Sequence, residues 1–394
     1  MTLNKELNNN LIASAQNALD WMKNTMMFKP DGSYGIWERV RINMNQIVYW
    51  VRSDCCGEAA ISFLYHSKIE SDSQSRTIAN NLMKTLLSQQ TLRGAFIFYQ
   101  YFSPDITAMD KNPNGGAGFW PNDNGKLLGL MCKYANEFPK LPIAQSAKDA
   151  CRFFQATQNA EGWWNLNETD YPGTCFVAWP IFGLSYAYQL LGDEAIKNTA
   201  LRALDYMDTL LLPSGRMKTS YEINKVENWR PVSSEAAEAL LAYCTAQKCL
   251  GVDKSSQINQ LIGFLERLTD ESGAIHNCDE TCMNASEQNN ADLTDLVYTA
   301  GYALHAWIAA WETTARIECL THARKLASFL ASIQCANENP LWDGAWRGSY
   351  DIAKKAWDGR ADQANELDEG GMYSVYTGWC SATITTGLLK TSQL

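Results

Sequence analysis

Apolar and polar positions along the chain form two kinds of helical pattern. The first kind has an apolar stripe at i, i+3, i+4 with charged residues on the opposite side, as expected of an amphipathic surface helix. The second kind is poor in charge and rich in Ala, Gly and Ser, as expected of a helix packed on all sides. Stretches of the first kind run at 9–27, 76–90, 142–158, 194–212, 255–269 and 313–334. Stretches of the second kind run at 54–67, 122–135, 175–190, 233–249, 292–312 and 375–390. The two kinds alternate, which predicts six outer and six inner helices.

A glycine followed by an aromatic or apolar residue separates each outer helix from the next inner helix. These glycines are Gly32, Gly94, Gly162, Gly215, Gly273 and Gly344. Their spacing gives one unit of about sixty residues repeated along the chain, and such a period sets the fold. The sequence therefore predicts an all-α fold, an (α/α)6 barrel or toroid of six helical hairpins. We expect a single domain, residues 1–394, with all six loops at one mouth of the barrel.

Charge and composition exclude two classes of protein. The formal net charge is −10 and no Lys/Arg-rich run is present, whereas nucleic-acid binding requires a basic face. The uncharged run Tyr171–Leu191 is long enough to raise the question of a membrane span. It is interrupted by Pro172, Gly173 and Pro180, so we interpret it as a buried inner helix. Twelve cysteines and an N-terminus without an apolar signal core predict a cytoplasmic protein. Together with the charge and the interrupted apolar run, this predicts a protein that binds neither nucleic acid nor membrane.

Carboxylates gather where the inner helices begin. Asp54 and Glu58 are four positions apart, so both lie on one helical face. Asp123 begins the next inner helix, with Lys126 one turn further on. The structural alternative is a helix cap at each aspartate and a pairing of Glu58 with Arg52. As an acid/base pair we favour Asp54 and Asp123, with Glu58, Asp292 and Glu369 as further catalytic candidates.

Aromatic and basic residues accompany these acids at the loop ends of the hairpins. The chain has 14 Trp and 17 Tyr, and aromatic rings stack on sugar faces while charged groups bind hydroxyls. The substrate-binding candidates are Arg52, Trp120, Lys126, Trp163, Trp164, Trp179, Tyr221, Trp229, Arg230, Trp346, Arg347, Tyr373, Tyr376 and Trp379.

Cofactor and metal signals are weak. His276, Cys278 and Cys282 have a loosely plausible ligand spacing, but no second pair accompanies them. No phosphate-binding loop, nucleophile elbow or dinucleotide fingerprint is present. We therefore expect no metal and no cofactor, and we expect His305 to be a hydrogen-bonded core residue.

With its six-hairpin repeat and the strings Arg52-Ser53-Asp54 and Trp120 to Lys126, the chain resembles the six-hairpin glycosidase superfamily. The resemblance implies carbohydrate chemistry by a pair of carboxylates at inner-helix ends. A weaker resemblance, to terpenoid cyclase and prenyltransferase toroids, rests on Gln158 to Trp164, which fits their Q-x-x-x-G-x-W repeat. The cyclase acid motif and the prenyltransferase zinc ligands are both missing.

Three functions stay open at this point: a glycoside hydrolase acting on a short oligosaccharide, a terpenoid cyclase or prenyltransferase-like enzyme, and a non-catalytic carbohydrate-binding toroid. A sugar site needs polar partners beside each ring, whereas a cyclase site needs rings almost alone. We expect an acidic, aromatic-lined pocket at the loop mouth, with at least as many charged or amide side chains in the cavity wall as aromatic ones. Hydrolysis is the leading prediction.

Overall fold

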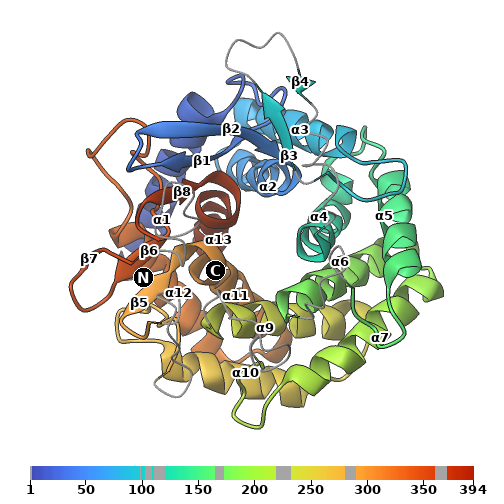
Figure 1. Cartoon of the computed structure of the whole chain (residues 1–394). Helices are drawn as coiled ribbons and strands as arrows, with labels where there is room; N and C mark the ends of the chain where they lie inside the picture. The colour runs from blue at the N-terminus through green and yellow to red at the C-terminus, as the bar shows by residue number, and fades with distance from the viewer. Residues whose placement is uncertain are drawn as a thin grey trace.

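The helices form two concentric rings (Figure 1). The computed structural model describes residues 2–97, 99–102, 109–110, 120–164, 173–218, 232–279, 290–359 and 371–394. The outer ring consists of α1 (Thr2–Trp21), α3 (Ser73–Ser88), α5 (Ile143–Thr157), α7 (Glu194–Leu210), α10 (Ser255–Leu268) and α12 (Ile317–Ser332). The inner ring consists of α2 (Ser53–Ile69), α4 (Pro121–Lys133), α6 (Cys175–Leu191), α9 (Val232–Leu250), α11 (Gly301–Thr314) and α13 (Thr383–Thr391). The predicted (α/α)6 toroid is confirmed.

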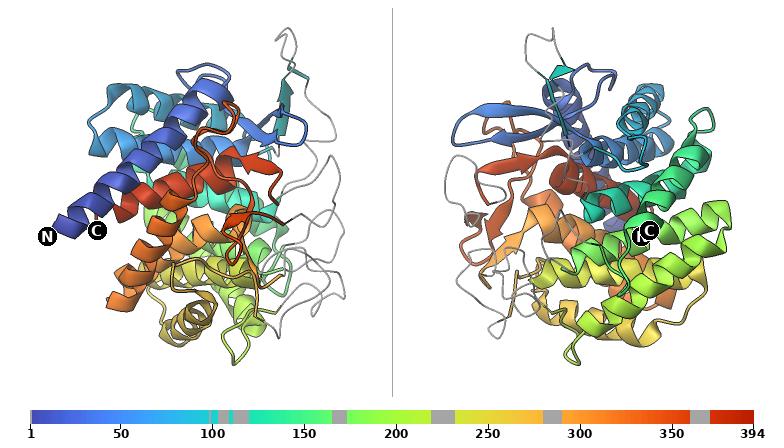
Figure 2. Two further views of the ribbon diagram at one scale, coloured as in Figure 1. Left: turned by 90° about the vertical axis from the view of Figure 1, so that its left-hand side faces the viewer. Right: turned by 45° about the vertical axis from the view of Figure 1, so that its right-hand side comes forward.

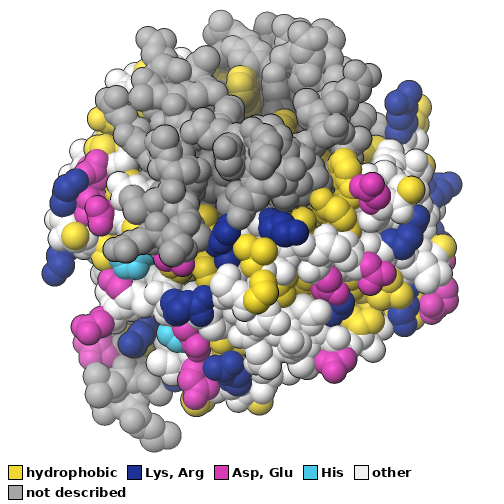
Figure 3. Space-filling model, turned by 60° about the horizontal axis from the view of Figure 1, so that its bottom comes forward, with side chains coloured by type: hydrophobic (Ala, Val, Ile, Leu, Met, Phe, Trp, Pro, Cys, Tyr) yellow, Lys and Arg dark blue, Asp and Glu magenta, His cyan; other side chains and the backbone are white. Residues whose placement is uncertain are grey.

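Burial follows the two patterns read from the sequence. In the outer helix α5 the buried residues include Ile143, Ala147, Ala150 and Phe154, which form one stripe. The exposed outer-ring surface seen in Figure 3 carries acidic and basic side chains intermixed. The inner helix α6 is buried continuously from Cys175 to Ala187. The uncharged run is thus an inner helix, and no helix among the described residues is long and apolar enough to cross a membrane. The cytoplasmic location stays a prediction.

The glycine turns join each hairpin to the next one. All six have positive φ, between 79° and 99°, a region that glycine adopts without steric cost. A Cβ on Gly94 would lie 2.0 Å from the carbonyl oxygen of Asp149 in α5, and one on Gly344 would lie 2.5 Å from that of Asn17 in α1. Each turn packs in this way against the outer helix of the following hairpin. The last turn packs against the first helix, which closes the ring.

Glutamine side chains reinforce three of these junctions. Nε2 of Gln158 donates to the carbonyl of Gly162 (2.8 Å) and to that of Thr199 in α7 (3.0 Å). Gln90 and Gln334 make the corresponding bonds to their own turn glycines and to Ser146 and Ser14 of the next outer helices. The pattern that suggested a cyclase repeat is therefore a hydrogen-bonded connection between hairpins.

Two small antiparallel sheets lie at the loop mouth, and the sequence analysis did not predict them. The strand order of one is β4-β3-β2-β1-β8, and that of the other is β5-β6-β7. Their strands are β1 (Trp37–Arg41), β2 (Gln46–Arg52), β3 (Tyr99–Phe102), β4 (Met109–Asp110), β5 (Leu293–Asp295), β6 (Ser349–Asp351), β7 (Ala356–Trp357) and β8 (Ser374–Tyr376). Figure 2 shows the strands of these sheets on one side of the rings.

The last two inner helices begin later than predicted, because strands take their expected first turns. β5 and β8 lead into the π-helical turns η4 (Leu296–Ala300) and η5 (Thr377–Ala382), which precede α11 and α13. Two further short elements are η1 (Met22–Met26), after α1, and η2 (Ala135–Glu137), after α4. Pairing of β1 with β8 brings the first and last hairpins together, with Arg39 opposite Tyr376.

Candidate active site

A buried arginine holds three carboxylates together at the loop mouth. Arg52 ends β2 and precedes α2 in an extended conformation, which turns its side chain toward the barrel axis. Its Nε lies 3.1 Å from Asp54 Oδ1, and its Nη1 lies 3.1 Å from Glu38 Oε1. Its Nη2 lies 2.8 Å from Asp123 Oδ2. Residues from β1, α2 and α4 thus share one cation.

Lys126 forms the second centre of the cluster, one helical turn after Asp123. Its Nζ lies 3.2 Å from Glu58 Oε1 and 3.8 Å from Asp54 Oδ2, and it donates to the hydroxyl of Tyr302 (2.9 Å). The Tyr302 hydroxyl in turn donates to Glu58 Oε1 (2.9 Å). α4 can bring Lys126 this far inward because it packs closely on α6: a Cβ on its neighbour Gly125 would lie 2.3 Å from the α6 backbone.

Aromatic rings enclose these charges. The indole N–H of Trp379 donates to Asp54, and the Arg52 guanidinium lies 4.1 Å from the centre of the same ring. Tyr376 stacks on Trp379 with ring centres 4.8 Å apart. Trp179 contacts Tyr302 edge to face at 4.7 Å. Each of these rings lies beside a charged or hydroxyl group, as a sugar site requires.

The two aspartates differ in proton affinity. Burial raises the pKa of Asp123 to about 6, and the neighbouring charge of Asp54 adds to the effect. Burial acts on Asp54 in the same direction, but Arg52 and Lys126 outweigh it and hold the pKa of Asp54 below its usual value. Burial also raises the pKa of Glu58, against the opposing effect of Lys126. Neighbouring carboxyls with such divergent environments can serve as acid and base.

The two aspartates are also close in space. Arg52 Nη2 lies 3.2 Å from Asp54 Oδ2 and 2.8 Å from Asp123 Oδ2. The two carboxyl oxygens cannot be farther apart than the sum of these distances. A small hollow beside them is lined by Ser53, Phe96, Trp120 and Asn124 as well as by the two aspartates.

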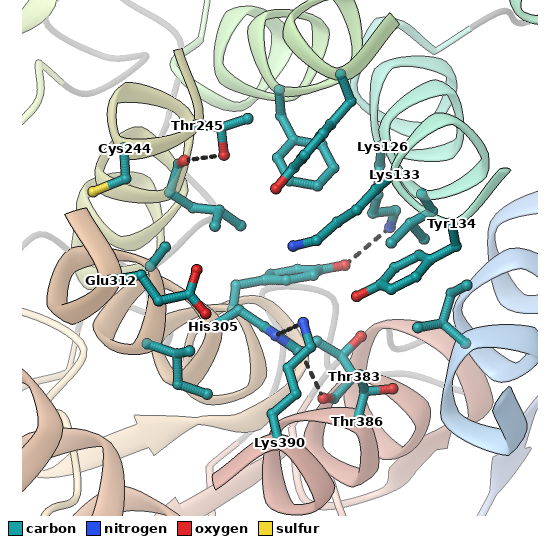
Figure 4. Close-up of a pocket in the computed structure, with 18 of the residues that line it drawn as sticks. Lys126, Lys133, Tyr134, Cys244, Thr245, His305, Glu312, Thr383, Thr386 and Lys390 are labelled. Atoms are coloured by element: carbon teal, nitrogen blue, oxygen red, sulfur yellow. Dashed lines mark hydrogen bonds between the residues drawn. The ribbon is translucent and has the colours of Figure 1, made fainter. Parts of the chain in front are cut away.

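A larger cavity of about 370 Å³ extends along the barrel axis below this cluster. Glu58, Lys126, Trp179 and Tyr302 line its inner end, and Figure 4 shows Lys126 among the side chains that surround the cavity. Seven charged or amide side chains and six Trp, Tyr or Phe rings line it. The balance predicted for a pocket at the loop mouth is not tested by this count and stays a prediction. The cavity runs away from the loops, however, and lysines outnumber carboxylates along it. At the mouth itself, the predicted acidic pocket corresponds only to the small hollow lined by Asp54 and Asp123.

The structure brings together half of the predicted site. Trp120 is half-buried and stacks on Phe176 at 6.0 Å beside the small hollow. The predicted residues in or against the cluster are Arg52, Asp54, Glu58, Trp120, Asp123, Lys126, Trp179, Tyr376 and Trp379. Tyr221, Trp229, Arg230 and Glu369 lie outside the described residues.

Other predicted residues lie elsewhere. Trp164 and Trp346 are fully buried, and their indoles donate to carbonyls of α5 and α12, so they are core residues of the hairpins. Trp163 bonds Glu161 and faces the outer helix α7. Arg347 pairs with Glu338.

Asp292 and Tyr373 are likewise not brought into the cluster. Asp292 is exposed because the expected helix start is the approach to β5. Tyr373 is half-buried next to β8, where its carbonyl accepts a hydrogen bond from Ile42.

The sequence analysis missed Glu38, Tyr302 and Thr383. Glu38 lies on a strand that was not predicted: the sequence Trp37 to Arg41 does not alternate between apolar and polar residues, and four of its five residues are buried. Tyr302 and Thr383 begin helices that sequence placed earlier, and Thr383 donates to Glu58 Oε1 (3.1 Å).

Among the described residues, no group of three or more His, Cys, Asp or Glu side chains is arranged so that it could hold a metal ion. His276 Nδ1 lies 2.5 Å from the carbonyl of Ala291, and Cys282 is outside the described residues.

Comparison with known proteins gives the fold its context. No protein-family model and no curated protein sequence matches the chain. Among solved structures, the cellobiose 2-epimerase of Spirochaeta thermophila superposes with a TM-score of 0.71 at 11% identity, covering 100% of this chain and 98% of that one. The cellobiose 2-epimerase of Bacillus thermoamylovorans superposes with a TM-score of 0.69 at 9% sequence identity, covering 97% of this chain and 99% of that one.

A GH76 α-1,6-mannanase of Salegentibacter superposes with a TM-score of 0.58 at 10% sequence identity, covering 97% of this chain and 98% of that one. That structure is of an inactive variant in complex with α-1,6-mannotriose. The chain has the fold of these enzymes. At such identities the likeness concerns the fold, and the chemistry has to be argued from the site. The inactive mannanase carries asparagine at two consecutive aspartates, whereas the present sequence has no two consecutive aspartates.

Proposed function

We propose that the protein is a glycoside hydrolase acting on a short oligosaccharide, with Asp123 as general acid and Asp54 as the partner carboxylate. The observation that carries the proposal is the divergence of their pKa values within one arginine-bridged cluster. A carboxyl with a raised pKa keeps the proton that the leaving oxygen requires. A carboxylate with a lowered pKa stays charged and stabilises or attacks the anomeric carbon.

The spacing of the pair supports a retaining mechanism. Retaining glycosidases have carboxyl groups about 5–5.5 Å apart, whereas inverting enzymes need about 6.5–9.5 Å to admit a water molecule. Because both aspartates bond one nitrogen, at 3.2 and 2.8 Å, their nearest oxygens lie closer together than the separation that inverting enzymes need. Asp54 then acts as the nucleophile and Asp123 as acid and later as base.

The polar character of the cluster supports a sugar over an isoprenoid. A cyclase holds carbocations by aromatic faces in a dry cavity, whereas here Glu58, Lys126 and the Tyr302 hydroxyl lie in the cavity wall. The paired aspartates on two different helices also distinguish the proposed site from one built on consecutive aspartates.

The test is a screen with aryl α- and β-glucosides and mannosides, together with cellobiose and mannobiose, followed by NMR of the first-formed products. Release of a reducing sugar with retained anomeric configuration supports the proposal. Inversion would contradict the assigned geometry. Epimerised or isomerised sugar without bond cleavage would replace hydrolysis by sugar epimerisation, and binding without turnover would favour a carbohydrate-binding toroid.

Single amide substitutions identify the catalytic pair on any substrate found. Asp54→Asn and Asp123→Asn should each lower kcat/KM by about 10²–10⁴, the usual contribution of such groups. Asp292→Asn is the matched control, because it makes the same change at an exposed position of the same mouth. Azide added to Asp54→Gly should restore turnover by taking the place of the nucleophile. Activity of both aspartate variants within threefold of wild type would refute the assignment.

A further inference from the structure

The outer half of the large cavity is separate from the carboxylate cluster. It is formed largely by the C-terminal turns of the inner helices, at the end of the barrel opposite the loops, by residues such as Tyr65, Lys133, Glu312 and Lys390, with His305 from the second turn of α11. Lys248 and Glu312, with side chains 57% and 43% exposed, lie at its rim. This half of the cavity therefore opens to solvent away from the proposed catalytic mouth.

Two lysines here lack a carboxylate partner. At the inner end Lys126 is compensated by Glu58 and Asp54, and at the rim Lys248 pairs with Glu312 at 3.3 Å. Lys133 and Lys390 form no ion pair with any described residue. Figure 4 shows both side chains pointing into the same space from α4 and α13. A protein of net charge −10 thus has an excess of positive charge inside this cavity.

Hydrogen bonding fixes the direction in which Lys390 donates. His305 Nε2 lies 3.0 Å from the carbonyl oxygen of Thr383, so this nitrogen carries the proton. His305 Nδ1 is then an acceptor, and it lies 3.2 Å from Lys390 Nζ. Burial and the charge of Lys390 lower the pKa of His305 well below its usual value, so the ring is neutral. The ring holds one N–H of Lys390 and leaves the others for a ligand.

The remaining wall is apolar and aromatic. Ile61, Leu130, Phe182, Leu241 and Ile308 line it together with Tyr65, Tyr134 and Tyr186. Lys133 also lies 5.0 Å from the ring centre of Tyr186. The whole cavity, of about 370 Å³, falls within the range of small-molecule sites, which combine apolar walls with a few convergent polar groups, and the outer half is its part nearest to solvent.

We propose that this half of the cavity is a second binding site, which takes a small organic anion from the face opposite the loops. Its carboxylate or phosphate group binds Lys133 and Lys390, and its apolar body packs against the tyrosines and aliphatic side chains. Burial and Lys133 together lower the pKa of Lys390 well below its usual value, against the opposing effect of Glu312. The negative charge of a bound anion offsets the electrostatic repulsion between Lys133 and Lys390. The proposal does not rest on glycoside hydrolysis.

The experiment is calorimetric titration of the full chain with benzoate and phenyl phosphate, with benzyl alcohol as the neutral probe of similar shape. Both lysines are replaced singly in Lys133→Met and Lys390→Met, which keep the chain length and remove the charge. Lys140→Met removes the same charge from an exposed loop and is the matched control. In parallel, reductive methylation followed by mass spectrometry measures which lysines the anion protects.

We expect one or both anions to bind and benzyl alcohol to bind at least tenfold more weakly. Each cavity variant should lower anion affinity at least tenfold, Lys140→Met should leave it within twofold, and the anion should protect Lys390 from methylation. Tighter binding of phenyl phosphate than of benzoate would identify the phosphate class, and the reverse order the carboxylate class. Equal binding of the neutral probe, unchanged affinity in both lysine variants, or no protection of Lys390 would each overturn the proposal.

Discussion

Replacing one turn glycine by alanine should separate backbone strain from the close packing that joins the hairpins. Gly94 and Gly192 both have positive φ, of 94° and 69°. A Cβ on Gly94 would lie 2.0 Å from the carbonyl oxygen of Asp149, whereas one on Gly192 would meet nothing within 4 Å. Gly94→Ala therefore adds a collision between hairpins, and Gly192→Ala adds only the cost of the backbone conformation.

The expected magnitudes differ accordingly. The left-handed conformation costs alanine about 1–2 kcal/mol, of which about 0.4–1 kcal/mol is recovered from the unfolded chain. Gly192→Ala should thus destabilise by about 1 kcal/mol. Overpacking against a backbone atom that cannot rotate away adds about 1–3 kcal/mol or more. We therefore expect a loss of about 2–4 kcal/mol in Gly94→Ala.

Urea unfolding followed by circular dichroism at 222 nm measures the difference in unfolding free energy between the two variants. Equal slopes of this free energy against urea concentration check that both variants unfold in the same way. With an unfolding entropy of about 2.1 cal/mol/K per residue, 3 kcal/mol in this chain corresponds to a fall in Tm of about 4 °C. A Gly94→Ala protein as stable as Gly192→Ala would refute the inference that the turns join the hairpins by contact.

Three further predictions concern the site and its surroundings. The pH dependence of kcat/KM should be bell-shaped. Activity should fall as pH rises through about 6, because Asp123 then loses its proton, and it should fall at low pH as Asp54 becomes protonated. An alkaline limb at pH 8 or above would contradict the assignment of Asp123 as the acid. Arg52→Met should cost about 3–5 kcal/mol at pH 7, since it leaves buried carboxylates without their cation. Urea unfolding should show a smaller cost at pH 5, because Asp123, whose pKa is raised to about 6, is then protonated and one buried charge fewer loses its cation. The contribution of Asp54, whose pKa is lowered, is still present at pH 5 and disappears only at lower pH. Gln158→Ala should cost about 1–3 kcal/mol with KM unchanged, because it removes two hydrogen bonds that join neighbouring hairpins. Lost activity at full stability would instead indicate a catalytic role.

The two rings of helices could be predicted from the repeat because each signal that defines a helix or a turn lies within that short segment of the sequence. An outer helix needs only its own apolar stripe, and a turn needs only its glycine. The pairs Asp54/Glu58 and Asp123/Lys126 were found for the same reason, since helical spacing determines which side chains share a face. Placing both pairs at one point required the additional knowledge that neighbouring inner helices start at the same mouth.

The missed parts of the site depend on contacts between distant segments. Glu38 reaches Arg52 from β1, and β1 pairs with β8 more than 300 residues away. Lys133 and Lys390 each occupy the last turn of a helix, where a lysine is ordinarily explained by the helix dipole. Only their convergence in one cavity distinguishes them from such lysines, and convergence is not visible in either helix alone.

The Q-x-x-x-G-x-W pattern shows why a local motif can indicate the wrong function. Gln158 bonds its own turn and the next outer helix, Gly162 allows the close contact, and Trp164 fills the space between the helices of its hairpin. Any toroid that joins successive hairpins has to satisfy the same turn carbonyls and fill the same space. The pattern is therefore evidence for the architecture, shared by enzymes of unrelated chemistry. What distinguishes a sugar enzyme from a terpenoid cyclase has to be sought where the inner helices begin, and there this chain places paired aspartates under one arginine.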